Sequence, residues 1–358
     1  MKFIHCADLH LDSKMDSLPS EKAKIRREEV LSTFERLADY ASKINASAVI
    51  IAGDMFDTSR TTLKTRGRVL EAICKNSNVD FLYLSGNHDD ENFVSELQSY
   101  PNNFKVFTDD WQSFCYSNIV ISGVKVNSIN VSTIYDTLKL DENNVNIVTL
   151  HGQIADYKGE EQAEKISLPR LKNKYIDYLA LGHIHEDNFG KIDERGVWAQ
   201  SGCLEGRGFD ELGEKGLLVG TVEQGKADLE FVPLCRRRYR IIEADVTGRS
   251  LQETMENALT AVDEDICRVI LTGETTDETP DLAALERDFA GHCYFLQLRD
   301  ETRVARDIWE RAGEDSLRGL FLSELRRRYD AAADEEERKK IDLAVRFGLA
   351  ALDGRDIG

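Results

Sequence analysis

Seven side chains that can bind divalent metal ions occur in five short segments of the chain. They are Asp8 and His10, Asp54, Asn87, His151, and His183 with His185. Imidazole nitrogens together with carboxylate and amide oxygens are typical donors of mixed nitrogen–oxygen metal sites. Two ions about 3.5–4 Å apart need roughly three to four protein ligands each, with one carboxylate shared between them. The set is large enough for such a two-metal centre, with Asp54 as the shared ligand.

The segment from Gly86 to Asp89 combines three kinds of chemistry on four residues. Asn87 offers a neutral oxygen to a metal, His88 a titratable imidazole, and Asp89 a carboxylate able to hold that imidazole in place. One such segment is more often a turn, because Gly, Asn and Asp favour turns. A single Asp-x-His or His-x-His pair is also more often structural. The coincidence of five segments favours the metal centre.

Each of the five segments follows an apolar run that predicts a buried strand. These runs are residues 1–7, 47–52, 79–85, 145–150 and 176–181. Apolar residues at helical spacing predict helices over residues 21–44 and 61–75. The alternation of strands and helices is typical of an α/β sandwich. Loops at the carboxyl ends of strands carry the chemistry of α/β proteins, so these segments are well placed for it.

Short strands dominate from about residue 104 to residue 232 and predict a second sheet. The pattern breaks at residues 233–238, which mark the expected domain boundary. We therefore expect a catalytic domain over residues 1–235, a small α/β cap domain over 239–300, and a C-terminal helical segment over 302–358. Residues 302–351 are predicted to be helical, with apolar stripes over 318–325 and 341–349.

The composition is that of an ordinary globular chain with an acidic surface. The net charge of the 358 residues is −19, and residues 241–358 carry the larger share of the acidic excess. This argues against a broad basic face for nucleic acid, although bound metal ions can reverse the sign of the field within a site.

The cysteines and the N-terminus favour a reduced, cytoplasmic protein. The seven cysteines are scattered without a Cys-x-x-Cys pair, so we do not expect them to bind metal or form a disulfide framework. The first apolar stretch meets His5 and Asp8 at once and is read as a strand, not as a signal peptide. We expect no membrane span.

Taken together, five motifs resemble the signature of the calcineurin-like metallophosphoesterases. They are Asp8-x-His10, Gly53-Asp54-x-x-Asp57, Gly86-Asn87-His88-Asp89, His151 and Gly182-His183-x-His185. The resemblance implies an αββα sandwich of two sheets around a two-metal centre. By motif position, one ion would be held by Asp8, His10, Asp54 and His185, and the other by Asp54, Asn87, His151 and His183.

The same resemblance implies the catalytic roles. His88 would face the scissile phosphate and assist the leaving oxygen, and Asp89 would orient His88. Asp57 would support a ligand without binding metal itself, and Arg60 and Arg207 are candidates to approach the phosphate. Manganese is the expected ion, with iron and zinc as alternatives.

Two stretches distinguish the branch of the family. His10 is followed by Leu11 where protein phosphatases of this superfamily have glycine. Residues 3–13 and 202–216 instead resemble DNA-repair exonucleases of the SbcD/YhaO type. That resemblance implies a DNA exonuclease or endonuclease in an ATPase-linked repair complex, docked through its C-terminal helices on an SbcC- or SMC-like coiled-coil ATPase.

Alternatives remain open at this point. The helical stripes fit packing on the chain's own cap as well as docking on a partner, and a homodimer is a further candidate assembly. Small nucleotides and other phosphoesters are alternative substrates, which the same two-metal chemistry would hydrolyse. A third alternative is a non-catalytic subunit that keeps its metals as a scaffold.

Overall fold

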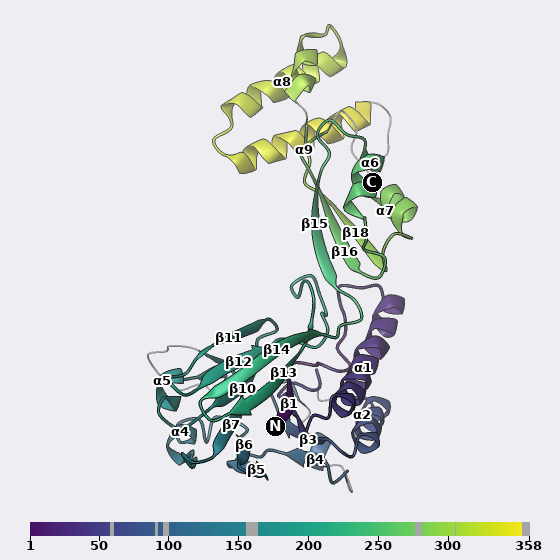
Figure 1. Ribbon diagram of the computed structural model, residues 1–358. Coiled ribbons are helices and arrows are strands. Elements are labelled where there is room, and N and C mark those ends of the chain that lie inside the picture. The colour runs from purple at the N-terminus through teal and green to yellow at the C-terminus, as the bar shows by residue number, and fades with distance from the viewer. Residues whose placement is uncertain are drawn as a thin grey trace. The chain divides into compact units, whose positions relative to one another are not determined.

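The chain folds into two compact units, Met1–Arg238 and Tyr239–Gly358 (Figure 1). The computed structural model describes residues 1–57, 61–89, 92–95, 100–154, 164–275, 281–304 and 306–352. The division between the units follows directly on residues 233–238, where the strand pattern of the sequence breaks. No helix in the described ranges has the length and apolar character needed to cross a bilayer.

The first sheet of the N-terminal unit has six strands within the described residues. In spatial order they are β14 (Lys226–Pro233), β13 (Gly216–Glu223), β1 (Lys2–Cys6), β2 (Ala48–Ala52), β3 (Asp80–Leu84) and β4 (Phe104–Val106). Strands β1 to β4 run parallel, whereas β13 is antiparallel to β1 and to β14. Parallel neighbours end at the same edge, so the loops after β1, β2 and β3 lie side by side.

The second sheet also has six strands in the part of the chain that is described. Their order is β11 (Asp187–Lys191), β12 (Val197–Ser201), β10 (Tyr178–Gly182), β7 (Val145–His151), β6 (Ile119–Gly123) and β5 (Gln112–Tyr116). The inner four strands are parallel and the two edge strands antiparallel. A short pair, β8 (Gln153–Ile154) and β9 (Lys165–Ile166), follows β7.

The core lies between the two sheets. Phe3, Ile50 and Leu82 from the first sheet share one apolar cluster with Ile147 and Tyr178 from the second, and all five side chains are fully buried. Strands covered on both faces are mostly apolar, which explains why β2 appears in the sequence as a continuous apolar run; β7 is buried throughout and includes the polar residues Asn146 and Thr149.

Helices cover the outer faces of both sheets. On one side lie α1 (Ser20–Lys43) and α2 (Leu63–Lys75), and the ring of Phe34 on α1 packs against Phe81 on β3. On the other side α4 (Ile134–Thr137) and α5 (Leu168–Leu171) join an apolar cluster with Val148 and Leu179. A short helix, α3 (Asn92–Ser95), follows β3. The predicted αββα sandwich is confirmed.

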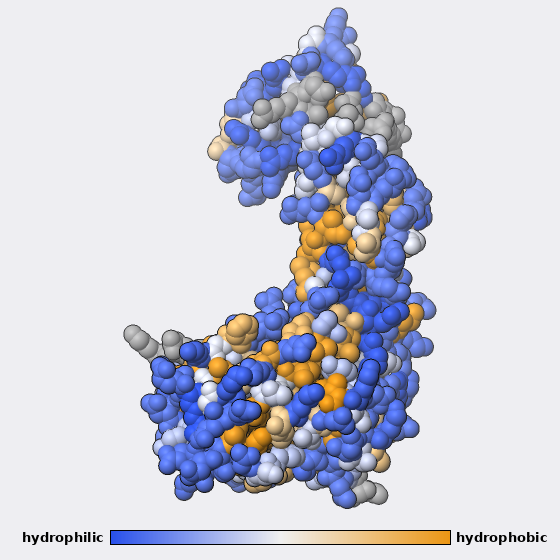
Figure 2. Space-filling model, viewed as in Figure 1, coloured by the Kyte–Doolittle hydropathy of each residue, from blue (hydrophilic) through white to orange (hydrophobic). Residues whose placement is uncertain are grey.

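The second unit begins with a parallel sheet of its own. Strands β15 (Tyr239–Asp245), β16 (Ile266–Thr272) and β18 (Phe295–Asp300) pack on α6 (Leu251–Ala258) and α7 (Leu282–Phe289) through an apolar cluster. Ile242 and Ala244 face that cluster, so Ile241 lies on the opposite face, where it is 38% exposed. Figure 2 shows hydrophobic surface gathered over these strands.

Three C-terminal helical segments complete the described part of the second unit. They are the 3₁₀ helix η1 (Arg306–Gly313), α8 (Leu317–Ala331) and α9 (Glu335–Leu352), and Trp309, Leu322 and Val345 form their common core. The prediction of helix from residue 302 is wrong at Arg303 and Val304, which form the short strand β19 (Arg303–Val304). This strand pairs with β17 (Glu274–Thr275), and the Arg303 N–H donates a hydrogen bond to the Gly273 carbonyl oxygen. The separation of a cap from a helical segment stays a prediction.

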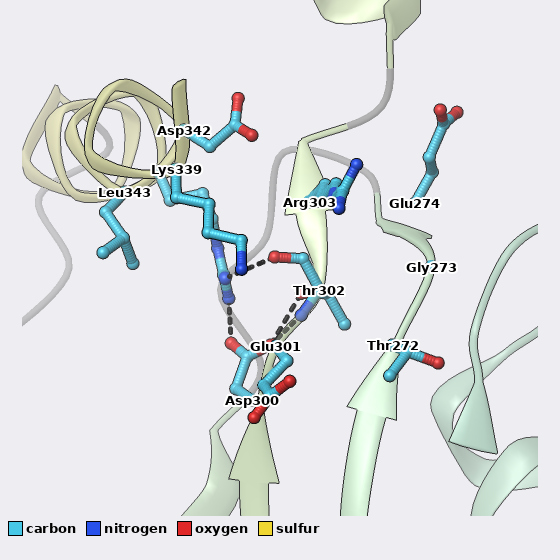
Figure 3. A pocket seen from close by; sticks show the side chains of 11 residues that line it. Thr272, Gly273, Glu274, Asp300, Glu301, Thr302, Arg303, Lys339, Asp342 and Leu343 are labelled. Atoms are coloured by element: carbon cyan, nitrogen blue, oxygen red, sulfur yellow. Dashed lines mark hydrogen bonds and ion pairs between the residues drawn. The ribbon is translucent and has the colours of Figure 1, made fainter. Parts of the chain in front are cut away.

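A pocket of about 640 Å³ lies where α9 meets the ends of β16 and β18 (Figure 3). Its lining combines acids and bases in similar numbers: Thr272, Gly273, Glu274, Asp300, Glu301, Thr302, Arg303, Lys339, Asp342, Leu343 and Arg346. Arg346 is only 4% exposed and forms an ion pair with Asp300. This ion pair ties α9 to the end of β18.

Candidate metal centre

The donors of the first sheet stand on the loops that follow its parallel strands. Asp8 and His10 follow β1, Asp54 follows β2 and Asn87 follows β3. Asp8, His10 and Asp54 have φ angles of 52°, 43° and 52°, in the left-handed region that non-glycine residues rarely adopt. The Asp8 N–H donates to the Gly53 carbonyl oxygen at 3.1 Å, and the His10 N–H donates to that of Asp54 at 3.0 Å. These bonds offset a conformational cost of about 1–2 kcal/mol per residue.

The donors of the second sheet come from the ends of β7 and β10. His151 is the last residue of β7, and His183 and His185 follow β10. Two hydrogen-bonded contacts link the sheets at this edge. The backbone N–H of His183 donates to both carboxylate oxygens of Asp8 at 3.0 Å, and His151 Nδ1 donates to the Ala52 carbonyl oxygen at 2.9 Å. Both sheets therefore supply the site.

Two glycines of the motifs are required by close contacts. Gly53 has φ of 101°, and a Cβ on it would lie 2.0 Å from His151 Nδ1. A Cβ on Gly86 would lie 2.2 Å from Asp54 Oδ1. Both distances are far below van der Waals contact, so only glycine lets these loops approach the donors.

One half of the site is built from Asp8, His10 and His185, whose donor atoms lie within 4.8 Å of one another. The Nε2 atoms of the two imidazoles are 3.3 Å apart. His10 Nδ1 lies 3.1 Å from Asp57 Oδ1, and His185 Nδ1 lies 2.7 Å from Glu211 Oε1. Each ring thus has a carboxylate behind it and directs Nε2 toward the other ring.

The other half is built from Asp8, Asp54 and His151, which also lie within 4.8 Å of one another. Asp54 Oδ2 is 3.3 Å from His151 Nε2 and 3.8 Å from His10 Nε2. Asn87 Oδ1 is 3.0 Å from His151 Nε2. The carboxylate of Asp54 therefore lies between one imidazole of each half, and Asp8 belongs to both groups.

The donor set fits divalent cations in both halves. Because the Nδ1–H of His151 donates to a carbonyl oxygen, its neutral ring presents a lone pair at Nε2, toward the oxygens of Asn87 and Asp54. The Nε2 atoms of His10 and His185 likewise face each other. Asp57 Oδ1 lies 3.1 Å from His10 Nδ1, and Glu211 Oε1 and Arg207 Nη2 lie 2.7 Å and 3.1 Å from His185 Nδ1. Converging lone pairs repel unless a cation lies between them.

Titration of the site reflects the same need for positive charge. Burial alone would lower the pKa of His151, but the hydrogen bond and charge of Asp54 outweigh it and raise that pKa to about 9. Burial would raise the pKa of Asp54, yet the hydrogen bond and charge of His151, with the charge of His10, hold it below its usual range. Burial raises the pKa of Asp8 to about 6. The carboxylates of Asp54 and Asp8 therefore favour positive charge beside them.

The remaining members of the predicted site lie around this cluster. The His183 ring is edge-on to that of His151, with ring centroids 5.3 Å apart. His88 is exposed, its backbone N–H donates to Asp54 Oδ1 at 2.9 Å, and its ring lies edge-on to His10 at a centroid distance of 5.3 Å. An exposed imidazole beside the donors can reach a bound substrate.

Asp89 is placed differently from the prediction that it orients His88. Its two carboxylate oxygens accept from the backbone N–H groups of Phe56 and Gly86, each at 2.8 Å. Burial raises the pKa of Asp89 to about 7, against the effect of these two donors. Because the carboxylate is buried beneath the loop, it holds the backbone of the motif and not the imidazole.

Glu211 is a functional neighbour that the sequence reasoning did not single out. It lies in the glycine-rich stretch 202–216, which resembles the exonucleases, but nothing in its spacing signals that it would contact a histidine 26 residues earlier. Arg207, expected near a phosphate, instead pairs with Glu211 and Asp57. Asp57 supports His10, as expected. Arg60 lies outside the described residues.

Comparison with known proteins agrees with this geometry. The calcineurin-like phosphoesterase family matches residues 1–187. The metallophosphoesterase YhaO of Bacillus subtilis is 24% identical over 245 residues, covering 64% of this chain and 60% of YhaO. The DNA double-strand break repair protein Mre11 of Sulfolobus acidocaldarius is 26% identical over 205 residues, covering 54% of this chain and 52% of Mre11.

A third relative belongs to the nuclease SbcCD of Staphylococcus epidermidis. This SbcCD component is 23% identical over 287 residues, covering 68% of this chain and 73% of its own length. The chain thus spans only about half to three fifths of the first two relatives. The family match covers more than half of this chain, including Asp8, His10, Asp54, Asn87, His151, His183 and His185. On this basis the chain belongs to the calcineurin-like phosphoesterase family.

Proposed function

We propose that the chain is a two-metal phosphodiester hydrolase that acts on DNA as an exonuclease or endonuclease. One observation carries the proposal: Asp54 Oδ2 lies between His10 and His151, with the exposed His88 bound through its backbone to the same carboxylate. This arrangement combines a shared metal ligand with an imidazole that is free to meet a substrate. Family membership supports hydrolysis of a phosphoester.

The ions would be held by Asp8, His10, Asp54 and His185 on one side and by Asp54, Asn87, His151 and His183 on the other. When bound, two divalent ions supply Lewis-acid chemistry that activates water and offsets the charge of the phosphate. Manganese is the proposed ion, with iron and zinc as alternatives, because mixed nitrogen and oxygen donors suit these metals.

The chain's own residues contribute position and protons. His88 stands at the rim of the donor cluster, and an imidazole there can donate a proton to the leaving oxygen, which is typically worth about 10²–10⁴ in rate. Asp54 fixes the start of that loop by accepting the His88 N–H, and Asp89 fixes the loop from beneath through Phe56 and Gly86. The proposed roles of His88 and Asp89 are therefore proton donor and loop support.

DNA is proposed as the substrate because of the names of two relatives. One is a DNA double-strand break repair protein and the other is part of a nuclease. The net charge of −19 favours a second candidate, a phosphodiesterase for small nucleotides, because an acidic surface repels a long polyanion more than a short one.

A substrate panel separates these two functions. Release of nucleotides from single- and double-stranded DNA is measured with manganese, beside hydrolysis of a small chromogenic phosphodiester. We expect turnover of DNA by the wild type. The variant His292→Ala serves as a control and should also turn over DNA, because its histidine lies in the second unit and is not one of the proposed site residues. Activity on the small diester with none on either DNA would refute the nuclease proposal. No activity on any phosphoester, with metals bound, would favour the scaffold alternative.

We also propose that the C-terminal helices dock on a coiled-coil ATPase of the SbcC type. Leu317 and Leu320 on α8 are 69% and 70% exposed, and Leu343 and Phe347 on α9 are 47% and 46% exposed. Each pair is spaced by three or four residues and therefore shares a helix face. Such faces fit helix docking in a groove or on a partner helix.

Removal of residues 302–358 tests this docking. The truncated chain is expected to lose co-purification with a co-expressed SbcC-type ATPase and to keep two metals per chain. Because truncation could disturb the whole second unit, the point variant Leu320→Asp provides a milder test. Its control is Arg327→Ala, which changes another exposed residue of α8. Retained co-purification by both the truncation and Leu320→Asp would contradict the docking proposal.

A further inference from the structure

One guanidinium lies behind the histidines of one half of the site. Arg207 Nη1 donates to Asp57 Oδ1 at 3.1 Å, and Arg207 Nη2 donates to Glu211 Oε1 at 2.8 Å. Arg207 Nε donates to the same Glu211 oxygen at 3.2 Å. The fork of the guanidinium therefore spans two carboxylates that come from different parts of the chain.

Those two carboxylates are the ones that hold His10 and His185. Asp57 Oδ1 contacts His10 Nδ1 at 3.1 Å, and Glu211 Oε1 contacts His185 Nδ1 at 2.7 Å. The chain of contacts runs from the His10 imidazole through Asp57, Arg207 and Glu211 to the His185 imidazole, and Arg207 Nη2 also lies 3.1 Å from His185 Nδ1. A planar, rigid fork limits how far apart its two carboxylate partners can lie, and here each partner contacts one of the two imidazoles.

The loop that carries Arg207 is itself fixed from behind. The Arg207 N–H donates to Glu211 Oε2 at 2.8 Å, and Ser17 Oγ donates to the Arg207 carbonyl oxygen at 3.2 Å. Two residues earlier, Glu205 is paired with Arg26 on α1 at 2.8 Å, and both side chains are fully buried. The arginine is thus held in place independently of any substrate.

The other half of the site has a different support. His151 Nδ1 donates to the backbone carbonyl oxygen of Ala52, which ends β2, and His151 Nε2 lies beside Asn87 Oδ1. The ring of His151 is therefore held by the backbone of the first sheet, whereas His10 and His185 are held by side chains that Arg207 clamps. A change at Arg207 should act mainly on the His10/His185 half. This asymmetry distinguishes support of specific ligands from a general effect on folding.

We propose that Arg207 is a positioning residue that sets the metal affinity of the His10/His185 half of the centre through Asp57 and Glu211. The inference rests on the proposed two-metal function. It also reassigns Arg207: the guanidinium contacts two carboxylates and the His185 ring, and acts on the metal ligands, not on the phosphate of the substrate.

Calorimetric titration of the full chain with MnCl₂ alone tests the proposal without any substrate. The wild type is expected to bind two ions. Arg207→Lys, which keeps the charge but loses the fork, should weaken one of the two sites about tenfold, and Arg207→Ala should weaken the same site by up to about a hundredfold, the usual range for residues that support metal ligands. The second site should change little.

Arg195→Lys is the matched control. Arg195 forms an equivalent two-pronged ion pair with Asp177. Asp177 precedes β10 and His183 follows it, so this ion pair lies at the end of β10 that is opposite the metal donors. We expect unchanged affinity at both sites in this variant. Equal weakening of both sites by Arg207→Lys, or no weakening of either, would overturn the proposal.

Activity adds a second readout that separates positioning from substrate binding. With excess manganese, Arg207→Lys should recover kcat with unchanged KM for a phosphodiester. A raised KM that excess manganese does not correct would mean that Arg207 contacts the substrate. If the wild type binds two ions and hydrolyses no phosphoester, the proposed function fails while the titration still decides the role of Arg207. If the wild type binds no manganese, both proposals fail.

Discussion

The buried ion pair between Arg26 and Glu205 should make a large contribution to the stability of the first unit. Both side chains are fully buried, with Arg26 Nη2 2.8 Å from Glu205 Oε2. Glu205 Oε1 also accepts from Thr33 Oγ1 and from the Arg236 N–H, each at 2.6 Å. Burial opposes the charge on Arg26, but Glu205 and Glu29 outweigh it and raise its pKa.

Glu205→Ala would leave a buried guanidinium without this partner and remove an acceptor from two further donors. Breaking one side of a buried pair costs about 3–5 kcal/mol. At roughly 2–4 °C per kcal/mol for a unit of this size, Tm should fall by on the order of 10 °C. The remaining pair of Arg26 with Glu29, at 2.9 Å, places the effect toward the lower end of this range.

The assay is urea denaturation of the metal-free full chain, followed by calorimetry for Tm. Glu28→Ala is the matched control, because Glu28 is also an acidic residue with two basic partners, Lys64 and Arg68, but its side chain is 49% exposed. Exposed pairs contribute at most about 1 kcal/mol. Adding Arg26→Met to Glu205→Ala should recover part of the loss, since it removes the unpaired charge. Equal effects of Glu205→Ala and Glu28→Ala would refute the reasoning.

Three further outcomes follow from the site and the second unit. His88→Ala should retain two manganese ions per chain by metal analysis and lose about 10²–10⁴ in kcat; unchanged turnover would exclude His88 as the proton donor. Asp54→Asn removes the carboxylate that we propose is shared by the two ions, so dialysed protein should retain fewer than two ions, and full retention would contradict that proposed role. Burial raises the pKa of Asp342 to about 6. The folded state therefore keeps a proton on this carboxyl at pH values where the unfolded chain has lost it, and the free energy of unfolding falls as pH rises from about 4 to 6. Asp342→Asn should therefore raise the Tm of the full chain at pH 7 and change it little at pH 4; equal shifts at both would refute this.

The sandwich and the motif positions could be predicted because they depend on local patterns. A continuous apolar run identifies β2 and a mainly apolar one identifies β7, and the polar residues that end or follow them are brought to one edge by parallel pairing. The positions of Asp54 and His151 follow from this rule alone. Their close approach, including the glycine contacts at Gly53 and Gly86, depends on how the two sheets pack.

Contacts that depend on loop conformation could not be predicted. The sequence pattern suggests that Asp89 holds its neighbour His88, but the loop brings the Phe56 N–H, 33 residues earlier, to its carboxylate. Glu211 contacts His185 only because the segment after β12 folds back beneath the site. The strand β19 is not predictable because two residues are too few to show a period of two.

The donors that meet at the metal centre come from different layers of the sandwich, and this has a mechanical consequence. Asp8 and Asp54 are anchored in the first sheet, whereas His151 and His185 are anchored in the second. Bound ions would therefore cross-link two layers that are joined at this edge by hydrogen bonds such as those of His183 with Asp8. Chelation should let the layers part there first, and amide exchange should quicken at the ends of β2 and β7 before it does at their centres.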